Sequence, residues 1–463
     1  MENTRELILD MLMEILEKGS YSHLVIRSVL EKYNYSDGRD KAFVKRVTEG
    51  TLERLIQIDY CLNHFSSVPV PKMKPLIRNL MRMSAYQLLF MDKIPDSAVC
   101  NEAVKLAGKR GFRGLSGFVN GVLRTLARNR DTLPYPDEKE DEVKYLSVKY
   151  SMPECLIEMW ANAYGKARMR QLLEEFLREK PLRVRLKEQI TEEELKQWLL
   201  ALEENAVRYE KHPYLPYAYE LWNTESVKRL PGYEEGLFVV QDVSSMLAVE
   251  AAGIDEMKSD SAKAGFSGKI LVMDVCAAPG GKSMHFAEKL GKRGKVISRD
   301  VFKYKVALMR DNIERTGYEN IEVQEYDAGT KDESLLKKAD IVLADVPCSG
   351  LGVMGKKPDI KYRISSEVIT ELEKLQKKIL DVVWEYVKPG GILIYSTCTI
   401  SPGENDKMVK WFVKKHPFTL ESLSPYLPAV LKQEGEKGML QLFPGVHRTD
   451  GFFIARLRRT AEE

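Results

Sequence analysis

The spacing of apolar residues divides the chain into a helical first part and a last part in which strands and helices alternate. Over residues 1–128 apolar positions recur at steps of three and four, the spacing of one helix face. The segment 41–62 predicts one long helix, prolines at 69, 71 and 75 end it, and similar stripes follow over 77–88 and 119–126. We therefore predict an all-helical bundle over residues 1–130.

The middle of the chain has a mixed pattern. Residues 131–144 are acidic, contain prolines and predict a linker. Residues 145–236 predict a small α+β segment with a helix over 153–178, a strand over 182–187 and a second helix that begins at a capping box. Basic residues over 166–187 and aromatic residues over 209–222 are typical of RNA binding. A solvated helix face with core tyrosines explains the same pattern, and both interpretations stay open.

From residue 237 to residue 463 short apolar runs alternate with helical segments, which is typical of a doubly wound, Rossmann-like α/β sheet. The predicted strands cover 270–275, 294–298, 321–324, 340–344, 392–395 and 452–457. Ligands of such sheets bind beyond the carboxyl ends of the strands. Residues that directly follow a strand are therefore the candidates for chemistry.

The first of these strands leads from Asp274 into the loop Cys276, Ala277, Ala278, Pro279, Gly280, Gly281, Lys282, and a helix follows. Glycines let the backbone approach a ligand closely, and a helix N-terminus offers free N–H groups. The loop lacks the dinucleotide fingerprint. It also lacks the first glycine of a phosphate-binding loop, and Pro279 removes a backbone donor, so the sequence disfavours an ATP-hydrolysing enzyme.

Acidic residues follow the next three strands: Asp300, Asp327 and Asp345. An acid after the second strand is placed to hold ribose hydroxyls, and one after the third could reach an adenine amino group. Three carboxylates would repel phosphates, so an adenosine-bearing ligand without phosphate is favoured. S-adenosylmethionine fits that description, although each acid taken alone could instead cap a helix.

Two of the six cysteines, Cys348 and Cys398, directly follow the fourth and fifth strands. Such a pair suits methylation of cytosine C5, which is too electron-poor to attack a methyl sulfonium. A thiolate that adds to C6 makes C5 nucleophilic, a base then removes the C5 proton, and an acid near N3 assists the addition. Asp345 could be that acid, but the residues alone do not decide which cysteine attacks.

Composition changes this picture in two ways. A chain of 463 residues with 44% hydrophobic content is too long for a single hydrophobic core, so we expect several domains. Its net charge of +3 is an average, and the N-terminal part is more basic than the rest. Residues 1–130 hold 21 Lys and Arg against 14 Asp and Glu, which favours RNA binding by the bundle over a structural or oligomerisation role.

The cysteines are widely spaced without a C-x-x-C pair, so we expect free thiols and no metal site. The acidic start is unlike a signal peptide, and no stretch reaches the ~18 apolar residues of a membrane span. We expect a cytoplasmic, monomeric protein that does not enter a membrane.

The motifs DVCAAPGGK, DVPCSGLG and YSTCT, followed by GFFIARL, resemble in that order those of the RNA 5-methylcytosine methyltransferases. The helical part resembles a NusB-like RNA-binding domain through DKAFVKRVTEGTLERL, IRNLMRMSAYQLLFMDKIPDSAVCNEAVKLA and GFVNGVLR, and FVVQDVSSMLA matches the entry to the family's catalytic domain. The resemblance covers almost the whole chain and is strongest to the branch that methylates cytosine 967 of bacterial 16S rRNA.

The resemblance implies an S-adenosylmethionine pocket formed by residues 276–282 with Asp300, Asp327 and Asp345. It implies that Cys398 is the nucleophile and that Cys348 helps to release the product. The sequence departs from the family pattern after Asp300, where Val-Phe-Lys-Tyr-Lys stands in place of a small or polar start. An RNA-binding or antitermination factor with an inactive methyltransferase-like domain is the alternative hypothesis.

Overall fold

The protein is described here by a computed structural model that covers residues 3–32, 38–224, 226–263 and 269–460. The chain forms two compact units. The helical unit comprises Met1–Arg178 and Met354–Arg363, and the sheet unit comprises Glu179–Val353 and Ile364–Glu463. The boundaries of these two units differ from those of the four predicted parts. The helical unit also contains ten residues from the C-terminal half of the chain, Met354–Arg363.

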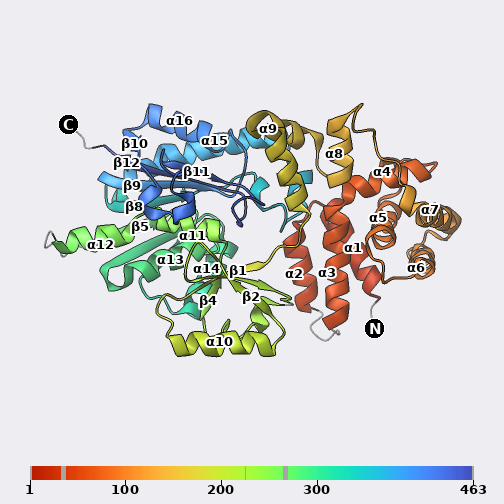
Figure 1. The fold of residues 1–463 in the computed structure, drawn as a ribbon, viewed down its shortest axis with the longest axis horizontal. Coiled ribbons are helices and arrows are strands. Elements are labelled where there is room, and N and C mark those ends of the chain that lie inside the picture. Colours follow the sequence, from red (N-terminus) through yellow and green to blue (C-terminus); the bar gives the residue numbers. More distant parts are fainter. Residues whose placement is uncertain (1–2, 33–37, 225, 264–268, 461–463) are drawn as a thin grey trace. The chain divides into compact units, whose positions relative to one another are not determined.

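The helical unit is built from amphipathic helices around one core, and no strand occurs among its described residues. Helices α1, α3 and α5 pack side by side, and α6 and α7 pack against each other and against α5 (Figure 1). Its α-helices are α1 (Thr4–Leu16), α2 (Ser22–Lys32), α3 (Gly38–Glu53), α4 (Leu55–Phe65), α5 (Pro75–Phe90), α6 (Asp96–Lys109), α7 (Ser116–Arg128), α8 (Glu142–Tyr150) and α9 (Glu154–Phe176).

The single helix predicted over 41–62 is wrong, because the chain turns at Arg54 between α3 and α4. Arg54 has φ −104° and ψ 14°, outside the helical region. Leu52 and Leu55 on either side of the turn are both buried. The apolar spacing continues across the turn because two helices bury their faces in the same core, and spacing alone cannot show the change of direction.

The predicted linker 131–144 lies between α7 and α8 and includes the start of α8 at Glu142. Helix α9 covers most of the segment predicted as a helix over 153–178, but Gly165 interrupts it with φ 80° and ψ 158°. Glycine is the residue that adopts this backbone without a steric penalty.

The sheet unit begins with a small antiparallel sheet in the order β2-β3-β1-β4. Its strands are β1 (Leu182–Leu186), β2 (Arg208–Lys211), β3 (Ala218–Trp222) and β4 (Phe238–Val240), and α10 (Glu192–Glu204) packs on it through Trp198 and Leu202. The predicted capping box is confirmed, since Thr191 and Glu194 each bond the other's backbone N–H at the start of α10.

The large sheet has the order β10-β12-β9-β8-β5-β6-β7, and β11 pairs with β12. Strands β5 to β9 are parallel, while β10, β11 and β12 run antiparallel to their neighbours. The bounds are β5 (Ile270–Asp274), β6 (Gly294–Asp300), β7 (Ile321–Glu325), β8 (Ala339–Asp345), β9 (Val387–Thr397), β10 (Phe418–Leu420), β11 (Met439–Leu442) and β12 (Phe452–Arg459). All six predicted strands are present, and the Rossmann-like class is confirmed.

Helices cover both faces of this sheet (Figure 1). Alternate residues of the central strands enter two separate cores: Val272 packs with α11 and α13, whereas Met273 packs with the core that contains α15 and α16. Both faces are buried, which is why these strands read as continuous apolar runs. The helices are α11 (Val243–Glu250), α12 (Ile254–Lys263), α13 (Gly281–Leu290), α14 (Lys303–Thr316), α15 (Ser366–Val383) and α16 (Asp406–Lys415).

Candidate active site

The chemistry-bearing residues gather at the carboxyl edge of the large sheet. Asp274, Asp300 and Asp345 are the last residues of β5, β6 and β8, and Cys398 directly follows β9. Because these strands are parallel neighbours, their carboxyl ends lie along one edge.

The loop after β5 turns sharply into α13. Gly280 has φ +98°, and a Cβ placed there would lie 3.3 Å from the Cγ of Met309. Gly280 precedes α13 without a side-chain cap, so the first amides of that helix are not capped by a side chain. The loop therefore offers backbone donors at a point where a side chain would obstruct the approach of a ligand.

Asp274 lies under this loop and is buried. Its Oδ2 accepts a hydrogen bond of 2.7 Å from Ser283 Oγ, whereas its Oδ1 has no partner among the described residues. Burial raises the pKa of Asp274 to about 7. An unsatisfied buried acceptor beside a glycine turn is suited to a donor group supplied by a ligand.

Lys282 joins this loop to the end of β8. Its Nζ lies 2.7 Å from Asp345 Oδ2, and Ser396 Oγ donates to Asp345 Oδ1 over 2.7 Å. Burial opposes the charge of Lys282, but the neighbouring carboxylates outweigh it and raise the pKa of this amine. Lys282 therefore forms an ion pair with a carboxylate, whereas the lysine of a phosphate-binding loop contacts phosphate groups. This difference disfavours the ATP-hydrolysing alternative.

The two remaining predicted acids differ. Asp300 is buried, and its oxygens accept from the amides of Ala278 (3.4 Å) and Phe302 (3.2 Å), so it borders the cofactor loop. Asp327 is exposed, and its oxygens accept from Gly329 N (2.8 Å) and Thr330 Oγ1 in its own turn. No hydrogen bond or ion pair joins Asp327 to the described residues of the cofactor loop.

The two predicted catalytic cysteines meet. Cys348 Sγ and Cys398 Sγ lie 3.3 Å apart, and both side chains are half-buried. The contact with Cys398 and then burial raise the pKa of the Cys348 thiol well above its usual value. Burial and nearby carboxylates likewise raise the pKa of Cys276, the third cysteine at this edge. The pairing brings together residues 50 positions apart in the chain.

Glu404 supports the Cys348 loop, and sequence reasoning missed it. This fully buried carboxylate accepts from Ser349 N (2.8 Å) and Gln376 Nε2 (2.9 Å), and it also accepts from Ser349 Oγ. Burial raises the pKa of Glu404. The sequence does show an acidic residue, Glu404, shortly after Cys398. Residue spacing could not show that its side chain reaches the loop after β8.

The site fits S-adenosylmethionine. Asp300 borders the glycine turn, the turn permits close approach of a ligand, and Asp274 Oδ1 is an acceptor without a partner among the described residues. When bound, this cofactor supplies an electrophilic methyl group. The residues that would hold it are those predicted over 276–282, together with Asp300 and Asp345.

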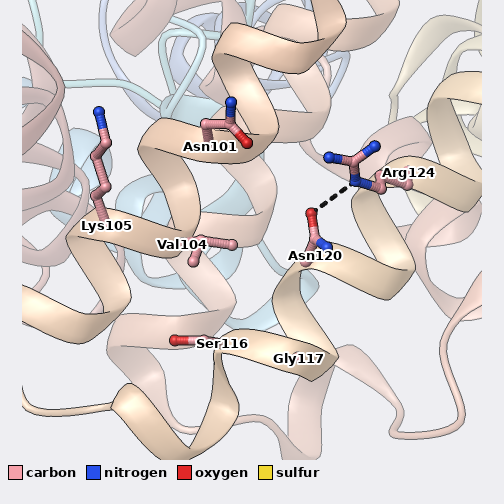
Figure 2. Close-up of a pocket in the computed structure, with 7 residues that line it drawn as sticks. All are labelled: Asn101, Val104, Lys105, Ser116, Gly117, Asn120 and Arg124. Atoms are coloured by element: carbon pink, nitrogen blue, oxygen red, sulfur yellow. Dashed lines mark hydrogen bonds between the residues drawn. The ribbon is translucent and has the colours of Figure 1, made fainter.

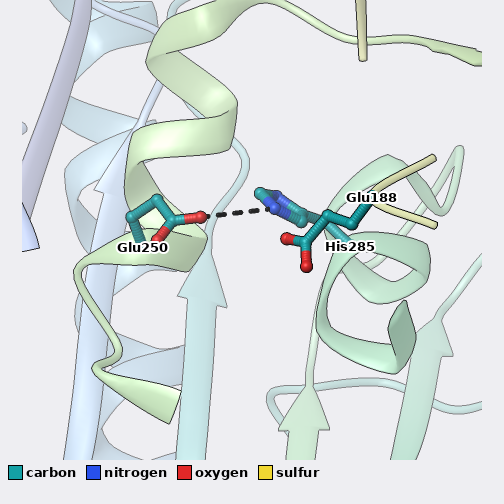
Figure 3. Close-up of side chains that lie close together, drawn as sticks. All are labelled: Glu188, Glu250 and His285. Atoms are coloured by element: carbon teal, nitrogen blue, oxygen red, sulfur yellow. Dashed lines mark ion pairs between the residues drawn. The ribbon is translucent and has the colours of Figure 1, made fainter. Parts of the chain in front are cut away.

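Another polar cluster lies around His285, in the middle of α13. Ligand atoms of Glu188, Glu250 and His285 lie within 4.8 Å of one another (Figure 3). The ammonium of Lys289 already lies 2.9 Å from Glu250 and 3.6 Å from Glu188. Burial lowers the pKa of His285 to about 4, so the ring is neutral at pH 7. The lysine supplies the positive charge here, and the expectation of no metal remains a prediction.

A groove of about 450 Å³ marks the helical unit. It lies between α6 and α7 and is lined by Asn101, Val104, Lys105, Ser116, Gly117, Asn120 and Arg124 (Figure 2). None of these lining residues is acidic, and Arg124 Nε donates to Asn120 Oδ1 over 2.9 Å.

The basic middle segment is less available for RNA than its sequence indicated. Arg183 and Arg185 are buried, and they pair with Glu220 and Asp242, and with Gln241 and Glu288, respectively. Tyr219 is buried as well. Tyr219 is thus a core tyrosine, as one interpretation had it, whereas the buried Arg183 and Arg185 belong neither to a solvated helix face nor to an RNA-binding surface.

No helix in the described part of the chain is long and apolar enough to cross a membrane.

Comparison with known proteins agrees with both units. The family model described as 16S rRNA methyltransferase RsmB/F matches residues 267–458, and the NusB family model matches residues 2–128. A Bacillus subtilis protein named probable ribosomal RNA small subunit methyltransferase B is 35% identical, with 99% of each chain covered. Ribosomal RNA small subunit methyltransferase B of Salmonella arizonae is 30% identical, with 98% of each chain covered.

Among solved structures, the crystal structure of PH0851 matches with a TM-score of 0.79 and 25% identity, and 99% of each chain is covered. Full-length matches at these identities establish the family and show that the two units occur together in it. The chain belongs to the RsmB/F family of ribosomal RNA methyltransferases and is an S-adenosylmethionine-dependent methyltransferase.

Proposed function

We propose that the protein methylates C5 of a cytosine in 16S rRNA, with position 967 as the expected target, through a covalent bond between cysteine and C6. The observation that carries this proposal is the 3.3 Å contact between Cys348 and Cys398 beside the cofactor loop. The names of the full-length relatives support the small-subunit rRNA substrate, and we expect the reaction in the cytoplasm.

Each residue has a defined role in this proposal. The Cys398 thiolate adds to C6 while Asp345 holds or protonates N3, which leaves C5 nucleophilic. When the methyl group joins C5, its bond to the sulfonium sulfur of the donor would break. Cys348 then accepts the C5 proton, the electrons of that C–H bond form the C5–C6 double bond, Cys398 leaves C6 as a thiolate, and any proton placed on N3 returns to Asp345. The raised pKa of Cys348 keeps this thiol protonated in the free protein, so it gives its own proton to water before it accepts the C5 proton.

Substitution of the two cysteines tests these roles. Cys398→Ser should abolish methyl transfer to rRNA, whereas Cys348→Ala should accumulate a protein–RNA adduct that survives denaturing electrophoresis. Cys155→Ser is a matched control, because Cys155 is an exposed cysteine of the helical unit. Retained activity in Cys398→Ser together with no adduct in Cys348→Ala would contradict the proposed roles.

The target position has its own test. Bisulfite mapping of 16S rRNA from a strain without this gene should show loss of methylation at cytosine 967. An unchanged signal there would contradict the position but not the chemistry.

We also propose that the helical unit binds the RNA, with the groove between α6 and α7 as a contact surface. Lys105 and Arg124 supply positive charge, and Asn101 and Asn120 can bond base edges or phosphates. Arg124→Ala should weaken rRNA binding and make it less dependent on salt. Arg27→Ala, a change at an exposed position of α2 outside the groove, serves as the control. Equal losses of binding in both variants would contradict a binding role for the groove.

A further inference from the structure

Cys398 lies between two threonines that bond the same buried side chain. Thr397 is the last residue of β9, Thr399 directly follows Cys398, and both threonines are buried. Asn405 Oδ1 accepts from Thr397 Oγ1 over 2.6 Å, and Asn405 Nδ2 donates to the carbonyl of Thr399 over 3.0 Å. One side-chain amide therefore holds the residues on both sides of Cys398.

The amide of Asn405 is itself fixed by the edge of the large sheet. Its Nδ2 also donates to Gln441 Oε1 over 2.7 Å, and Gln441 Nε2 donates to the carbonyl of Phe452 over 3.0 Å. Gln441 belongs to β11 and Phe452 to β12, which pairs with β9. Asn405 is buried, so each bond lost by a rotation of this amide would cost about 1–3 kcal/mol.

The side chain of Asn405 does not serve its own helix. Asn405 directly precedes α16, at the position where an asparagine side chain commonly accepts a hydrogen bond from the first N–H groups of the helix. No such side-chain cap is present at the start of α16. The bonding capacity of this amide is directed instead to the residues that flank Cys398.

The residue before Asn405 holds the loop of the other cysteine. Glu404 accepts from the amide of Ser349, the neighbour of Cys348. Ser349 Oγ and Thr399 Oγ1 lie 2.7 Å apart, so a hydrogen bond also joins the two cysteine loops directly. All these residues belong to the sheet unit. Two consecutive residues thus support the two loops whose sulfurs meet.

We propose that Asn405 is a positioning residue for Cys398, and that together with Glu404 it sets the separation of the two sulfurs. The consequence for attack on cytosine rests on the proposed function, whereas the placement of the sulfurs does not. Loss of a bond to Asn405 should therefore impair the reactions of Cys398 in proportion to how strictly they depend on its position.

The first experiment measures the sulfur separation without RNA or cofactor. Glutathione disulfide forms a mixed disulfide with one cysteine and releases one glutathione thiol; the thiolate of the other cysteine then displaces the second glutathione and closes the Cys348–Cys398 disulfide. Thr397→Val removes one of the bonds to Asn405. Because a misplacement of about 1 Å can slow a reaction by about 100-fold, this variant should slow closure by roughly tenfold.

Thr397→Val is preferred to Asn405→Ala, which leaves buried groups of three residues without their partner and lowers stability more. Thr397→Ser keeps the hydroxyl and should restore most of the closure rate. Thr316→Val is the matched control, because it removes a buried hydroxyl of the same unit that bonds the carbonyl of Asn312 in its own helix. Circular dichroism checks that every variant is folded at the assay temperature.

Three outcomes would overturn the proposal: wild-type closure in Thr397→Val, an equal slowing in Thr397→Ser or Thr316→Val, or no disulfide in the wild-type protein. Mass spectrometry of the cysteine peptides distinguishes the mixed from the closed disulfide. The expected result is a slow closure that is confined to the variant without the hydroxyl.

The second experiment tests the attack by Cys398. The probe is 16S rRNA transcribed with 5-fluorocytidine, together with S-adenosylmethionine. A fluorine at C5 cannot leave as a proton, so the bond between Cys398 and C6 persists after methyl transfer and traps the protein on the RNA. At saturating RNA, Thr397→Val should lower the rate constant of trapping by roughly tenfold, with Thr397→Ser close to the wild-type protein.

A merely structural role would reduce the amount of protein that can be trapped but not the rate constant of the folded remainder. An unchanged rate constant in Thr397→Val would therefore overturn the role of Asn405 in the attack. If the closure result holds while the wild-type protein forms no adduct on this RNA, the proposed cytosine chemistry fails and the positioning of the sulfurs by Asn405 stands.

Discussion

The loops after β5 and β8 lie at the same edge of the large sheet but are held in different ways. In the cofactor loop, Asp274 bonds Ser283 and Gly280 bonds Ala277, so these contacts join residues less than ten positions apart. The Cys348 loop instead depends on Glu404, which accepts from Ser349 N, and on Gln376, which donates to the carbonyl of Pro347. The cofactor loop thus combines local bonds with contacts to the ends of neighbouring strands, from Ala278 to Asp300 and from Lys282 to Asp345. The Cys348 loop depends on residues that follow it by 29 and 55 positions.

The largest effect should come from removal of Glu404. Glu404→Ala leaves the buried donors of Ser349 and Gln376 without their acceptor, and each unsatisfied buried group costs about 1–3 kcal/mol. We expect methyl transfer to fall by about 100-fold, because even small displacements of reacting groups have such effects. Methyl incorporation and chemical denaturation measure the two losses.

A substitution close to Glu404 in the chain serves as a control for a general loss of stability. Asp406→Ala removes an exposed partner of Lys410 two residues further along and should leave both measurements nearly unchanged. Comparable losses in the two variants would show that Glu404 does not specifically support the Cys348 loop.

The second effect compares two acids that the sequence treated alike. Asp300→Asn should weaken S-adenosylmethionine binding by roughly 10- to 100-fold, since hydrogen bonds to charged groups are worth about 1.5–3 kcal/mol. Asp327→Asn should have a smaller effect, because Asp327 is exposed and bonds its own turn. Calorimetric titration with the cofactor measures both, and the reverse order would contradict the assignment of Asp300 to the ribose.

The third effect compares two glycines with positive φ. Gly280→Ala and Gly291→Ala should each lower stability by about 1–2 kcal/mol, because a left-handed backbone disfavours a Cβ. Gly280→Ala alone should also weaken cofactor binding, since Gly291 lies at the opposite end of α13 with open space around it. Equal cofactor affinities in the two variants would remove the glycine turn from the binding site.

The last effect concerns pH and is the smallest when it is counted per pH unit. Burial lowers the pKa of Lys361 to about 7, below the value of 10.5 that an exposed lysine has. Between these values the unfolded chain binds a proton that the folded protein lacks, so stability from this group rises with pH, by at most about 1.4 kcal/mol per pH unit.

Lys361→Met should remove this rise, so that its stability relative to the wild-type protein is most favourable near pH 7 and declines towards pH 10. Denaturation at a series of pH values measures the difference. Lys410→Met, a change at an exposed lysine, should show no such trend. A pH-independent difference for Lys361→Met would show that Lys361 is charged in the folded protein.

Sequence reasoning located most of the catalytic edge because parallel strands buried on both faces leave a strong apolar signal. The strands that end in Asp300 and Asp345, and the glycine turn at Gly280, could be predicted for this reason. Sequence reasoning failed where the chain changes direction, because apolar spacing does not show the turn at Arg54. It also failed for Arg183, because the sequence does not show that this arginine is buried.

The sequence by itself determined the class of the large sheet, the order of its motifs and the residue types at its carboxyl edge. Those features depend on local periodicity and on residues close in the chain. Only the tertiary structure decided that Cys348 meets Cys398, that Glu404 lies beneath Ser349 and that Asp359 caps a helix begun at Ser22. These contacts join residues about 50, 55 and 337 positions apart, and local propensity carries no information about which distant groups will satisfy one another's hydrogen bonds.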